Sequence, residues 1–319
     1  MGSSMPTLHD IIAAQKNVYR FLKPTPLYQY PTLSELLGAS VWVKHENHQP
    51  VGAFKVRGGL NLAANLTPEE CKGGLFTAST GNHGQSIAFA GRAFGINTKI
   101  AVPEGANPGK VAAMLGLGAE VVFHGEDFDS AREWIMEQVA EKGGRFVGPN
   151  EELLIHGVGT YALEILHDLP DVECIIVPVG AGSGVCGTSI VAKSINPKIE
   201  VIAAQSAQAP AMQLSWKEGR MVSAEMNTFA EGIATRVPFE NTQSIMRKYL
   251  DDFYLVDDED IKQAIVLLLE HTHNLAEGAG AVALAAALNQ KERLRGKKVV
   301  LVMSGGNLAI NKLREILNS

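Results

Sequence analysis

Short apolar runs alternate along the chain with longer segments in which apolar residues recur at helical spacing. The runs Cys174–Val179 and Val299–Met303 are apolar without alternation, as expected for strands buried on both faces. Segments such as Val185–Ile195 and Asp258–His271 place apolar side chains every three to four residues, which predicts helices packed on a sheet. This repeated order of strand and helix predicts an α/β fold of parallel sheets with helices on both faces.

The same patterns predict the remaining elements. Asp257 is expected to cap the helix that begins at Asp258. Further strands are predicted at Ser40–Lys44, Gly74–Thr77, Lys99–Val102, Glu120–Phe123, Val201–Ala204 and Phe253–Val256. Further helices are predicted at Phe54–Leu66, Gly84–Phe94, Gly109–Leu117, Ser130–Lys142, Thr160–Leu169 and Ala309–Leu317.

Two domains, each with an open sheet, are expected. Residues 72–148 form a compact strand–helix block between two glycine-containing turns, which predicts a smaller domain. Residues 5–71 and 149–319 then form a large domain. Residues 1–4 are interpreted as the remnant of an expression tag before a native start at Met5.

Composition narrows the class of protein. Among 319 residues, 28 are Lys or Arg and 34 are Asp or Glu, so the net charge of −6 gives no basic footprint for nucleic acid. The longest apolar stretches are far shorter than the about 20 residues that a membrane helix needs. Three scattered cysteines and the lack of a secretory leader favour a cytoplasmic protein with free thiols.

A glycine-rich turn follows the apolar strand Cys174–Val179. It reads Gly180-Ala181-Gly182-Ser183-Gly184 and leads into a helix, so converging N–H groups and the helix N-terminus can bind a phosphate. A tight strand-to-helix turn alone is the plainer interpretation. The segment also matches a dinucleotide fingerprint, which makes a nicotinamide-dependent oxidoreductase an alternative. That fingerprint needs an acidic residue at the end of the next strand, where Gln205 stands, whereas Glu200 lies at its beginning.

Two other strand ends carry candidate chemistry. The loop Ser79–Gly84 offers hydroxyls and N–H groups to a second anion such as a carboxylate, although Ser79 or Thr80 could simply cap a helix. Lys55 follows Phe54 at the start of a mostly apolar helix. A lysine that is buried away from water has a lowered proton affinity and becomes a nucleophile toward aldehydes, whereas a solvated lysine would be inert.

Four motifs in this order resemble those of the pyridoxal-phosphate-dependent serine/threonine dehydratases and serine racemases. The chain has Glu46-Asn47-x-Gln49-Pro50-x-Gly52-Ala53-Phe54-Lys55-x-Arg57-Gly58, then Ser79–Gly84, Gly180–Gly184 and Ser304-Gly305-Gly306-Asn307. The resemblance covers nearly the whole chain. It implies the tryptophan synthase β-like fold (fold type II of these enzymes), a pyridoxal 5'-phosphate cofactor and a homodimer. It also implies that the large domain, residues 5–71 and 149–319, binds the cofactor and that the smaller domain, residues 72–148, lies on the substrate side.

The resemblance also implies a role for each site residue. Lys55 would hold the cofactor aldehyde as a Schiff base and take the substrate's Cα proton, with Thr80 as a second catalytic residue. The cofactor-binding residues would be Phe54, Lys55, Asn82, Gly180, Ala181, Gly182, Ser183, Gly184, Gly232 and Ser304. The substrate-binding residues would be Ser79, Thr80, Asn82, His83 and Arg132.

Two departures refine the expected activity, which is release of a 2-oxo acid and ammonia from a β-hydroxy amino acid. Racemases have a serine where this chain has Thr80, so dehydration ranks above racemisation, which stays open. Relatives that bind a divalent cation use carboxylates in the stretch that reads Ala204–Ala211 here, and this stretch has none, so no metal site is expected. A non-enzymatic amino-acid-binding protein is the remaining alternative.

Overall fold

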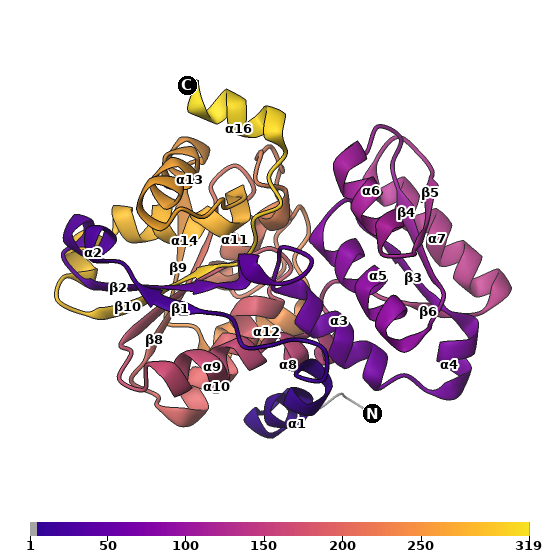
Figure 1. Ribbon diagram of the computed structural model, residues 1–319, viewed down its shortest axis with the longest axis horizontal. Coiled ribbons are helices and arrows are strands. Elements are labelled where there is room, and N and C mark those ends of the chain that lie inside the picture. Colours follow the sequence, from indigo (N-terminus) through magenta and orange to yellow (C-terminus); the bar gives the residue numbers. More distant parts are fainter. Residues whose placement is uncertain (1–4, 319) are drawn as a thin grey trace.

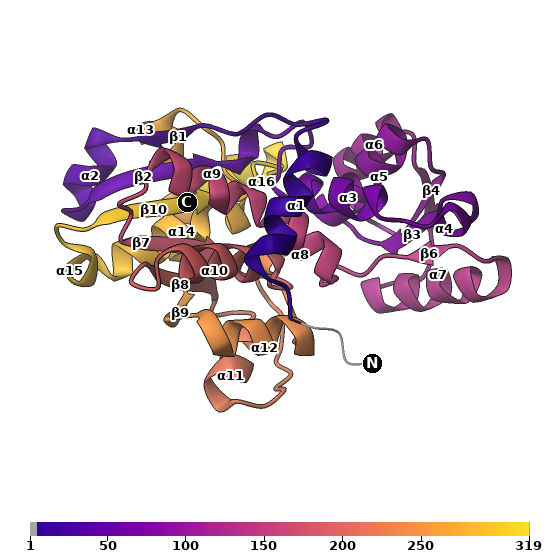
Figure 2. The same cartoon turned by 90° about the horizontal axis from the view of Figure 1, so that it is seen from below.

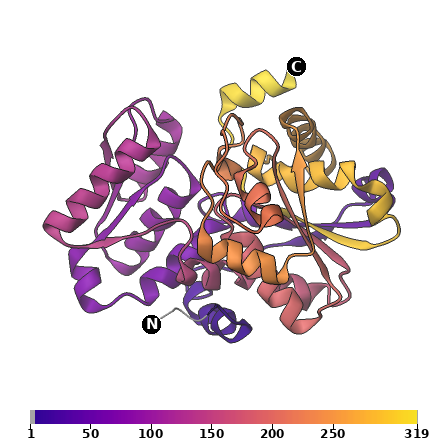
Figure 3. The same cartoon turned by 180° about the vertical axis from the view of Figure 1, so that it is seen from behind.

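A computed structural model describes residues 5–318 and contains two sheets. The larger sheet has the strand order β1-β2-β10-β7-β8-β9. The smaller sheet has the order β5-β4-β3-β6. The two sheets lie in separate lobes, and Figures 1 and 3 show them from opposite sides. The residues predicted at 1–4 to be a tag remnant lie outside the described residues.

Eight of the ten strands in the described residues match a predicted run within two residues, whereas the short strands β1 and β6 have no predicted counterpart. In the larger sheet they are β1 (Leu27–Gln29), β2 (Ser40–His45), β7 (Cys174–Pro178), β8 (Glu200–Ser206), β9 (Asp252–Val256) and β10 (Lys298–Met303). In the smaller sheet they are β3 (Leu75–Ala78), β4 (Thr98–Val102), β5 (Glu120–Phe123) and β6 (Arg145–Phe146). The smaller sheet therefore falls inside the range 72–148 proposed for the smaller domain.

Helices connect most of the strands along the chain. The first half contains α1 (Leu8–Val18), α2 (Pro31–Leu37), the short 3₁₀ helix η1 (Glu46–His48), α3 (Lys55–Ala64), α4 (Pro68–Gly73), α5 (Asn82–Phe94), α6 (Pro108–Gly116), α7 (Phe128–Lys142), α8 (Glu152–Val158) and α9 (Thr160–Asp168). The second half contains α10 (Ser183–Ile195), α11 (Ala211–Glu218), η2 (Glu231–Ile233), α12 (Glu240–Tyr249), α13 (Asp258–Thr272), α14 (Gly278–Asn289), α15 (Lys291–Leu294) and α16 (Ile310–Leu317).

Alternate residues of the central strands face opposite layers of helices. In β10, Val299 and Leu301 pack into one apolar cluster with α2, α13 and α14. Their neighbours Val300 and Val302 pack into the other cluster with α1, α9 and α10. Because both faces are covered, these strands need apolar residues at every position, which explains their unbroken apolar runs. Figure 1 shows α13 and α14 on one side of β2 and β10 and α9 and α10 on the other, and Figure 2 looks onto the sheet from the side of α9 and α10.

The sequence patterns do not predict α1, α2, α4, α8, α11, α12 or α15, and three further features differ from the sequence-based expectation. Strand β1 pairs antiparallel with β2, so the larger sheet is parallel except at this edge. The alanine-rich helix α14 is buried all round and therefore lacks the amphipathic period that indicates a helix in a sequence. Asp257 does occupy the N-cap position of α13, but its side chain accepts no capping hydrogen bond and instead accepts one from Gln208.

Strand order places three of the motifs next to one another, at the carboxyl ends of neighbouring strands of the larger sheet. β2, β10 and β7 are parallel neighbours, so the segments that follow them begin side by side. Lys55 comes after β2, Ser304 directly after β10 and Gly180 shortly after β7. The loop that begins at Ser79 follows β3 of the smaller sheet. The carboxyl ends of strands thus supply all four motifs, as is usual for ligand sites in open α/β folds.

Candidate active site

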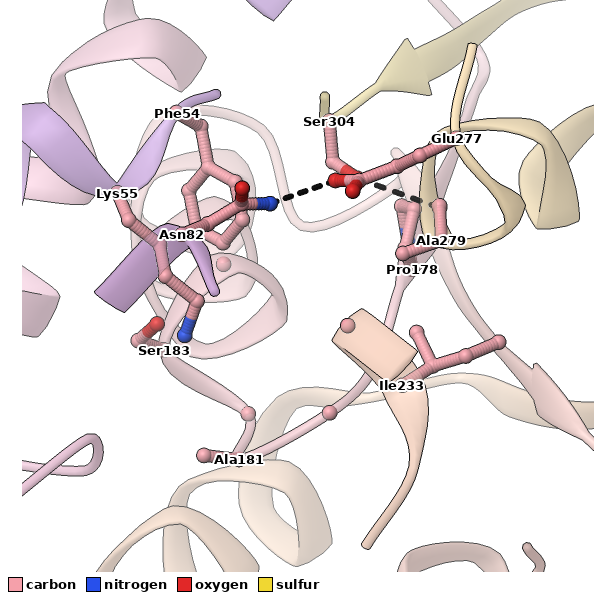
Figure 4. A pocket seen from close by; sticks show the side chains of 14 residues that line it. Phe54, Lys55, Asn82, Pro178, Ala181, Ser183, Ile233, Glu277, Ala279 and Ser304 are labelled. Carbon is pink, nitrogen blue, oxygen red and sulfur yellow. Dashed lines mark hydrogen bonds between the residues drawn. The ribbon is translucent and has the colours of Figure 1, made fainter. Parts of the chain in front are cut away.

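Fourteen residues from six regions of the chain line one cavity, which Figure 4 shows from close by. All ten residues predicted to bind the cofactor are among them. The cavity is lined by Phe54, Lys55, Asn82, Pro178, Gly180, Ala181, Gly182, Ser183, Gly184, Gly232, Ile233, Glu277, Ala279 and Ser304. Sequence reasoning missed Pro178, Ile233, Glu277 and Ala279.

Lys55 is the first residue of α3, and backbone pairing holds it against the end of β10. The N–H of Phe54 donates to the carbonyl of Ser304 at 3.0 Å, and Ala53 pairs with Gly305. The Lys55 Nζ lies 5.7 Å from the centroid of the Phe54 ring, and Figure 4 shows its side chain extending toward Ser183. Burial lowers the pKa of Lys55 to about 8, although Glu277 opposes this. The amine is therefore closer to its neutral, nucleophilic form than an ordinary lysine.

The turn Gly180–Gly184 can approach a ligand because it carries little besides backbone. A Cβ on Gly180 would meet the carbonyl of Gly232 at 2.3 Å. Gly182 has a φ of +99°, and a Cβ there would lie 2.9 Å from the side chain of Thr242. Within the described residues, no side chain caps the N-terminus of α10, so the first N–H groups of this helix remain available to a ligand in the cavity.

These properties fit a phosphate. Helix N-termini and glycine turns bind anions through N–H groups and the helix dipole, with no need for a cation. The buried lysine across the same cavity suits an aldehyde, and the Ser304 hydroxyl supplies a neutral polar group, which donates to Ala279 at 3.2 Å. The cavity residues therefore fit pyridoxal 5'-phosphate.

The dinucleotide alternative finds no support in the same region. Gln205 lies near the carboxyl end of β8, where the fingerprint needs a carboxylate, and its side chain is buried in contacts with the backbone of Ile233 and Gln213. Glu200 begins that strand and forms an ion pair with Lys297 at 3.2 Å. The third fingerprint glycine, Gly187, instead lets α10 pack closely on Gly159. A Cβ on Gly187 would lie 2.7 Å from the Cα of Gly159.

The loop after β3 holds two of its predicted substrate-binding side chains in structural contacts. The Ser79 hydroxyl accepts hydrogen bonds from the N–H groups of Gly81 and Gly84 at 3.2 and 2.9 Å, so it caps α5. His83 is buried, and its Nε2 lies 3.1 Å from the carbonyl of Val147. Burial, aided by the charge of Lys55, lowers the pKa of His83 to about 3, so the ring is neutral.

Asn82 lies at the first position of α5 with its amide fully oriented. Its Nδ2 donates to Glu277 Oε1 at 2.6 Å, and its Oδ1 accepts from Asn307 Nδ2 at 2.8 Å. Figure 4 shows the bond between Asn82 and Glu277 across the cavity. Burial raises the pKa of Glu277, although its bond to Asn82 and the charge of Lys110 oppose the shift. The sequence signal that could have identified Glu277 is an acidic residue directly before an apolar, alanine-rich helix.

Like Ser79 and His83, the predicted residues Thr80 and Arg132 lie outside the cavity wall. Thr80 is half-buried in the loop after β3 and does not line the cavity. Arg132 is exposed on α7, where its guanidinium lies 3.9 Å from Asp129, so the structure does not bring it to the other site residues. Its position is that of a solvated helix arginine, and its predicted contact with substrate receives no support from the structure.

The stretch after β8, where some relatives would hold a cation, is closed by hydrogen bonds. Ser206 donates to Asp258 at 2.7 Å, and Gln208 accepts from the backbone N–H of Asp258 at 3.1 Å. Over residues 5–318, the structure contains no group of three or more His, Cys, Asp or Glu residues that could hold a metal ion. That no metal binds here stays a prediction. In the same part of the chain, no helix is long and apolar enough to cross a membrane.

Comparison with known proteins agrees with this geometry. An L-threonine ammonia-lyase of Thermotoga maritima is 42% identical over 98% of this chain and 79% of its own length. A tomato (Solanum lycopersicum) threonine deaminase structure, 33% identical, superimposes with a TM-score of 0.93 over 98% of this chain and 91% of its own. A maize serine racemase structure, 29% identical, has the same TM-score over 99% and 98%.

The family comparison covers three of the motifs in full and the start of the fourth. The model of the pyridoxal-phosphate-dependent enzymes matches residues 18–305, a range that runs from before the Lys55 motif into the Ser304 motif. Lys55, the turn Gly180–Gly184 and Ser304 meet in one cavity on the matched fold. This chain therefore belongs to the pyridoxal-phosphate-dependent enzyme family.

Proposed function

We infer that this protein is a pyridoxal-phosphate-dependent ammonia-lyase that converts a β-hydroxy amino acid, such as L-threonine or L-serine, to a 2-oxo acid and ammonia. The observation that carries the inference is the meeting of Lys55, the turn Gly180–Gly184 and Ser304 in a single cavity. The naming of relatives at 33–42% identity as threonine ammonia-lyase or threonine deaminase supports the substrate class.

The site residues divide the work of holding the cofactor. The backbone of Gly180–Gly184 and the first turn of α10 would bind the phosphate, and Lys55 would bind the aldehyde carbon. Asn82 would donate to the ring oxygen, and Ser304 would face the ring nitrogen. When bound, pyridoxal phosphate supplies a carbonyl that takes up the substrate amine and a conjugated ring that stabilises negative charge at Cα.

Lys55 then moves the proton that starts the elimination. Its Nζ has a pKa of about 8, so a useful fraction is neutral near physiological pH and can accept the Cα proton. The β-hydroxyl takes a proton and leaves as water. A water molecule is taken up again when ammonia is released, so the net products are the 2-oxo acid and ammonia.

The start of α5 is the proposed site for the substrate carboxylate. Ser79 ties the loop to the N–H groups of Gly81 and Gly84, and this fixes the half-buried Thr80 and Asn82 between them. Because His83 is neutral, it adds no positive charge here. Anion binding at this loop therefore relies on N–H groups, hydroxyls and the dipole of α5.

The test is spectroscopic and chemical. Purified holoenzyme should show a visible absorption band that borohydride abolishes, with the reduced cofactor on the peptide that contains Lys55. Incubation with L-threonine or L-serine should release a 2-oxo acid. Lys55→Ala should lose both signals, whereas Lys262→Ala, on an exposed ion pair of α13, should keep both. A protein that stays colourless after incubation with the cofactor would refute the function.

Racemisation is the second candidate, because a serine racemase structure shares this fold at a TM-score of 0.93. Reversing the configuration at Cα needs a proton donor on the face opposite Lys55. The hydroxyl of Thr80 is the proposed donor. Threonine adds a methyl group where racemases have serine. We expect Thr80→Ser to increase the ratio of D-amino acid to 2-oxo acid formed from L-serine. An unchanged ratio would remove Thr80 from this role.

We propose a cytoplasmic homodimer for the working protein, with residues 72–148 as the domain that covers the substrate. The resemblance to serine and threonine dehydratases supports the dimer, and the position of the smaller sheet supports the division. Light scattering on the eluted protein would give the mass in solution, which should be twice the 34.2 kDa of the chain.

A further inference from the structure

Two side chains outside the sequence-based site fix the amide of Asn82. Asn307 donates through Nδ2 to the carbonyl of Val51 and to Asn82 Oδ1, both at 2.8 Å. On the other side, Asn82 Nδ2 donates to Glu277 Oε1 at 2.6 Å. Because a backbone carbonyl only accepts hydrogen bonds, Val51 identifies which atom of Asn307 is nitrogen. That assignment makes the facing atom of Asn82 its oxygen and turns the Asn82 nitrogen toward Glu277.

This orientation leaves one donor of Asn82 for the cavity. A side-chain amide nitrogen has two hydrogens, and Glu277 takes one of them. The Asn82 oxygen is already occupied by Asn307. Asn82 therefore faces the cavity, which it lines, as a hydrogen-bond donor.

Glycines make the room that both partners need. A Cβ on Gly305 would lie 2.3 Å from Glu277 Oε1, and a Cβ on Gly52 would lie 2.6 Å from Asn307 Oδ1. The two glycine segments are paired, since Gly306 donates to Gly52 at 2.9 Å and Glu277 donates its N–H to Gly305 at 3.1 Å. The turns next to Lys55 and Ser304 thus hold the partners of Asn82 as well.

The contacts also join the two parts of the fold. Asn82 begins α5 beside the smaller sheet, whereas Glu277 precedes α14 and Asn307 follows β10 in the larger one. Lys110 of α6 forms an ion pair with Glu231 of η2 and so joins the same two parts. Figure 4 shows Asn82 and Glu277 reaching toward each other from opposite walls.

We propose that Glu277 and Asn307 are positioning residues that hold Asn82 as a donor toward the ring oxygen of the cofactor. This inference rests on the proposed function, because it requires pyridoxal phosphate in the cavity. Neither residue is asked to touch the reacting atoms of the substrate. Their effect is on the polarity that Asn82 presents: a rotated amide would turn its carbonyl oxygen toward the electron-rich ring oxygen and repel it.

Asn307→Asp is the sharpest test, since the change keeps the shape and replaces a donor with an acceptor. The new carboxylate would repel the carbonyl oxygen of Val51 and Oδ1 of Asn82. This repulsion would favour rotation of the Asn82 amide. We expect the visible absorption maximum of the holoenzyme to shift and the Kd of the cofactor to rise roughly tenfold or more. Asn289→Asp, at an exposed bond to Asp260, is the matched control and should change neither.

Glu277 is tested with two variants. Glu277→Ala removes the acceptor and should reproduce the shifted absorption maximum, whereas Glu277→Gln keeps an amide oxygen and should restore most of the wild-type spectrum. A structural role alone would lower stability without moving the absorption maximum. Urea unfolding of each apoprotein identifies variants that fail to fold.

The outcomes separate this inference from the function on which it rests. If wild-type protein forms no borohydride-reducible adduct at Lys55, the proposed function fails. If it forms the adduct while Asn307→Asp and Glu277→Ala fold and keep both the wild-type absorption maximum and cofactor Kd, the function stands and the positioning role is refuted.

Discussion

At the scale of single residues, burial decides the chemistry more than residue type does. Lys55 becomes a weakly basic amine and His83 an unprotonated ring for the same reason, since each loses water that would stabilise its charge. Arg132 keeps its water on an exposed helix and takes no part in the cavity. A residue with the right functional group is therefore a site residue only where the fold removes it from solvent.

The lowered pKa of Lys55 predicts how the apoprotein takes up its cofactor. Only the neutral amine attacks an aldehyde, so the rate of pyridoxal phosphate binding should rise with pH through about 8 and then level off. With an ordinary lysine, the binding rate would continue to rise up to the usual pKa of 10.5. Stopped-flow absorbance measures this profile.

Glu277→Gln provides the comparison for that profile. Glu277 raises the pKa of Lys55, so its replacement should move the midpoint to lower pH. A wild-type rate that still climbs well above pH 8 would contradict the effect assigned to burial.

At the scale of elements, the active site depends on how two helices begin. Helix α10 starts from a glycine turn that no side chain caps in the described structure. Helix α3 starts at Lys55, and a buried ion cluster holds its first turn: Arg57 contacts Glu46 at 2.7 Å and Glu164 at 2.6 Å. One helix start is left open for a ligand and the other is fixed.

Gly182→Ala tests the open helix start. Its φ of +99° and the 2.9 Å approach to Thr242 should strain the turn and weaken cofactor binding by roughly tenfold or more. Gly38→Ala is the control, because Gly38 has a φ of +63° but nothing within 4 Å of its missing Cβ. Both variants should lose about 1–2 kcal/mol of stability, because alanine is strained at positive φ. Equal cofactor affinity in the two variants would contradict the proposal that the turn Gly180–Gly184 binds the cofactor phosphate.

Arg57→Met tests the fixed helix start. Burial alone would lower the pKa of Arg57, but Glu46 and Glu164 raise it, so the guanidinium stays charged. Its removal leaves two buried carboxylates short of partners and should cost about 3–5 kcal/mol in the free energy of unfolding. Arg295→Met removes an exposed pair with Glu292 and should cost less than about 1 kcal/mol. Urea unfolding that shows similar losses would refute this account.

At the scale of the whole molecule, both parts of the fold keep a neutral histidine buried. His45 ends β2 in the larger sheet, and burial together with His48 lowers its pKa to about 4. His83 lies on α5 beside the smaller sheet, with a pKa of about 3. Both are near 6.5 when exposed, so the unfolded chain binds more protons than the folded one below that pH.

Stability should therefore decrease on acidification. The contribution of each histidine is complete above pH 6.5 and is lost as pH falls toward its folded pKa, at roughly 1–2 kcal/mol per histidine by about pH 5. Urea unfolding at pH 7.5 and pH 5 measures the loss. A protein with both His45→Gln and His83→Gln should lose less than wild type over this range. An equal loss would assign the acid sensitivity to other groups.

Much of the fold was readable from the sequence because local patterns decide strands and helix starts. The unbroken apolar run of β10 indicates burial directly, and the glycine turn before α10 indicates a helix start that no side chain caps. Elements with weak periodicity escaped: α14 is apolar all round, and β1 has only three residues. The sequence could rank Lys55 as a nucleophile, but a resemblance was needed to bring four separate motifs into one site.

What the sequence determined by itself is the set of chemical groups and the turns that present them, since these depend on neighbours a few residues apart. The tertiary structure alone decided which groups meet. It brought Glu277 and Asn307 to Asn82 across separations of 195 and 225 residues, and it left Arg132 in water. The physical reason is that solvent exposure and hydrogen-bond partners depend on packing between distant segments, which no local pattern encodes.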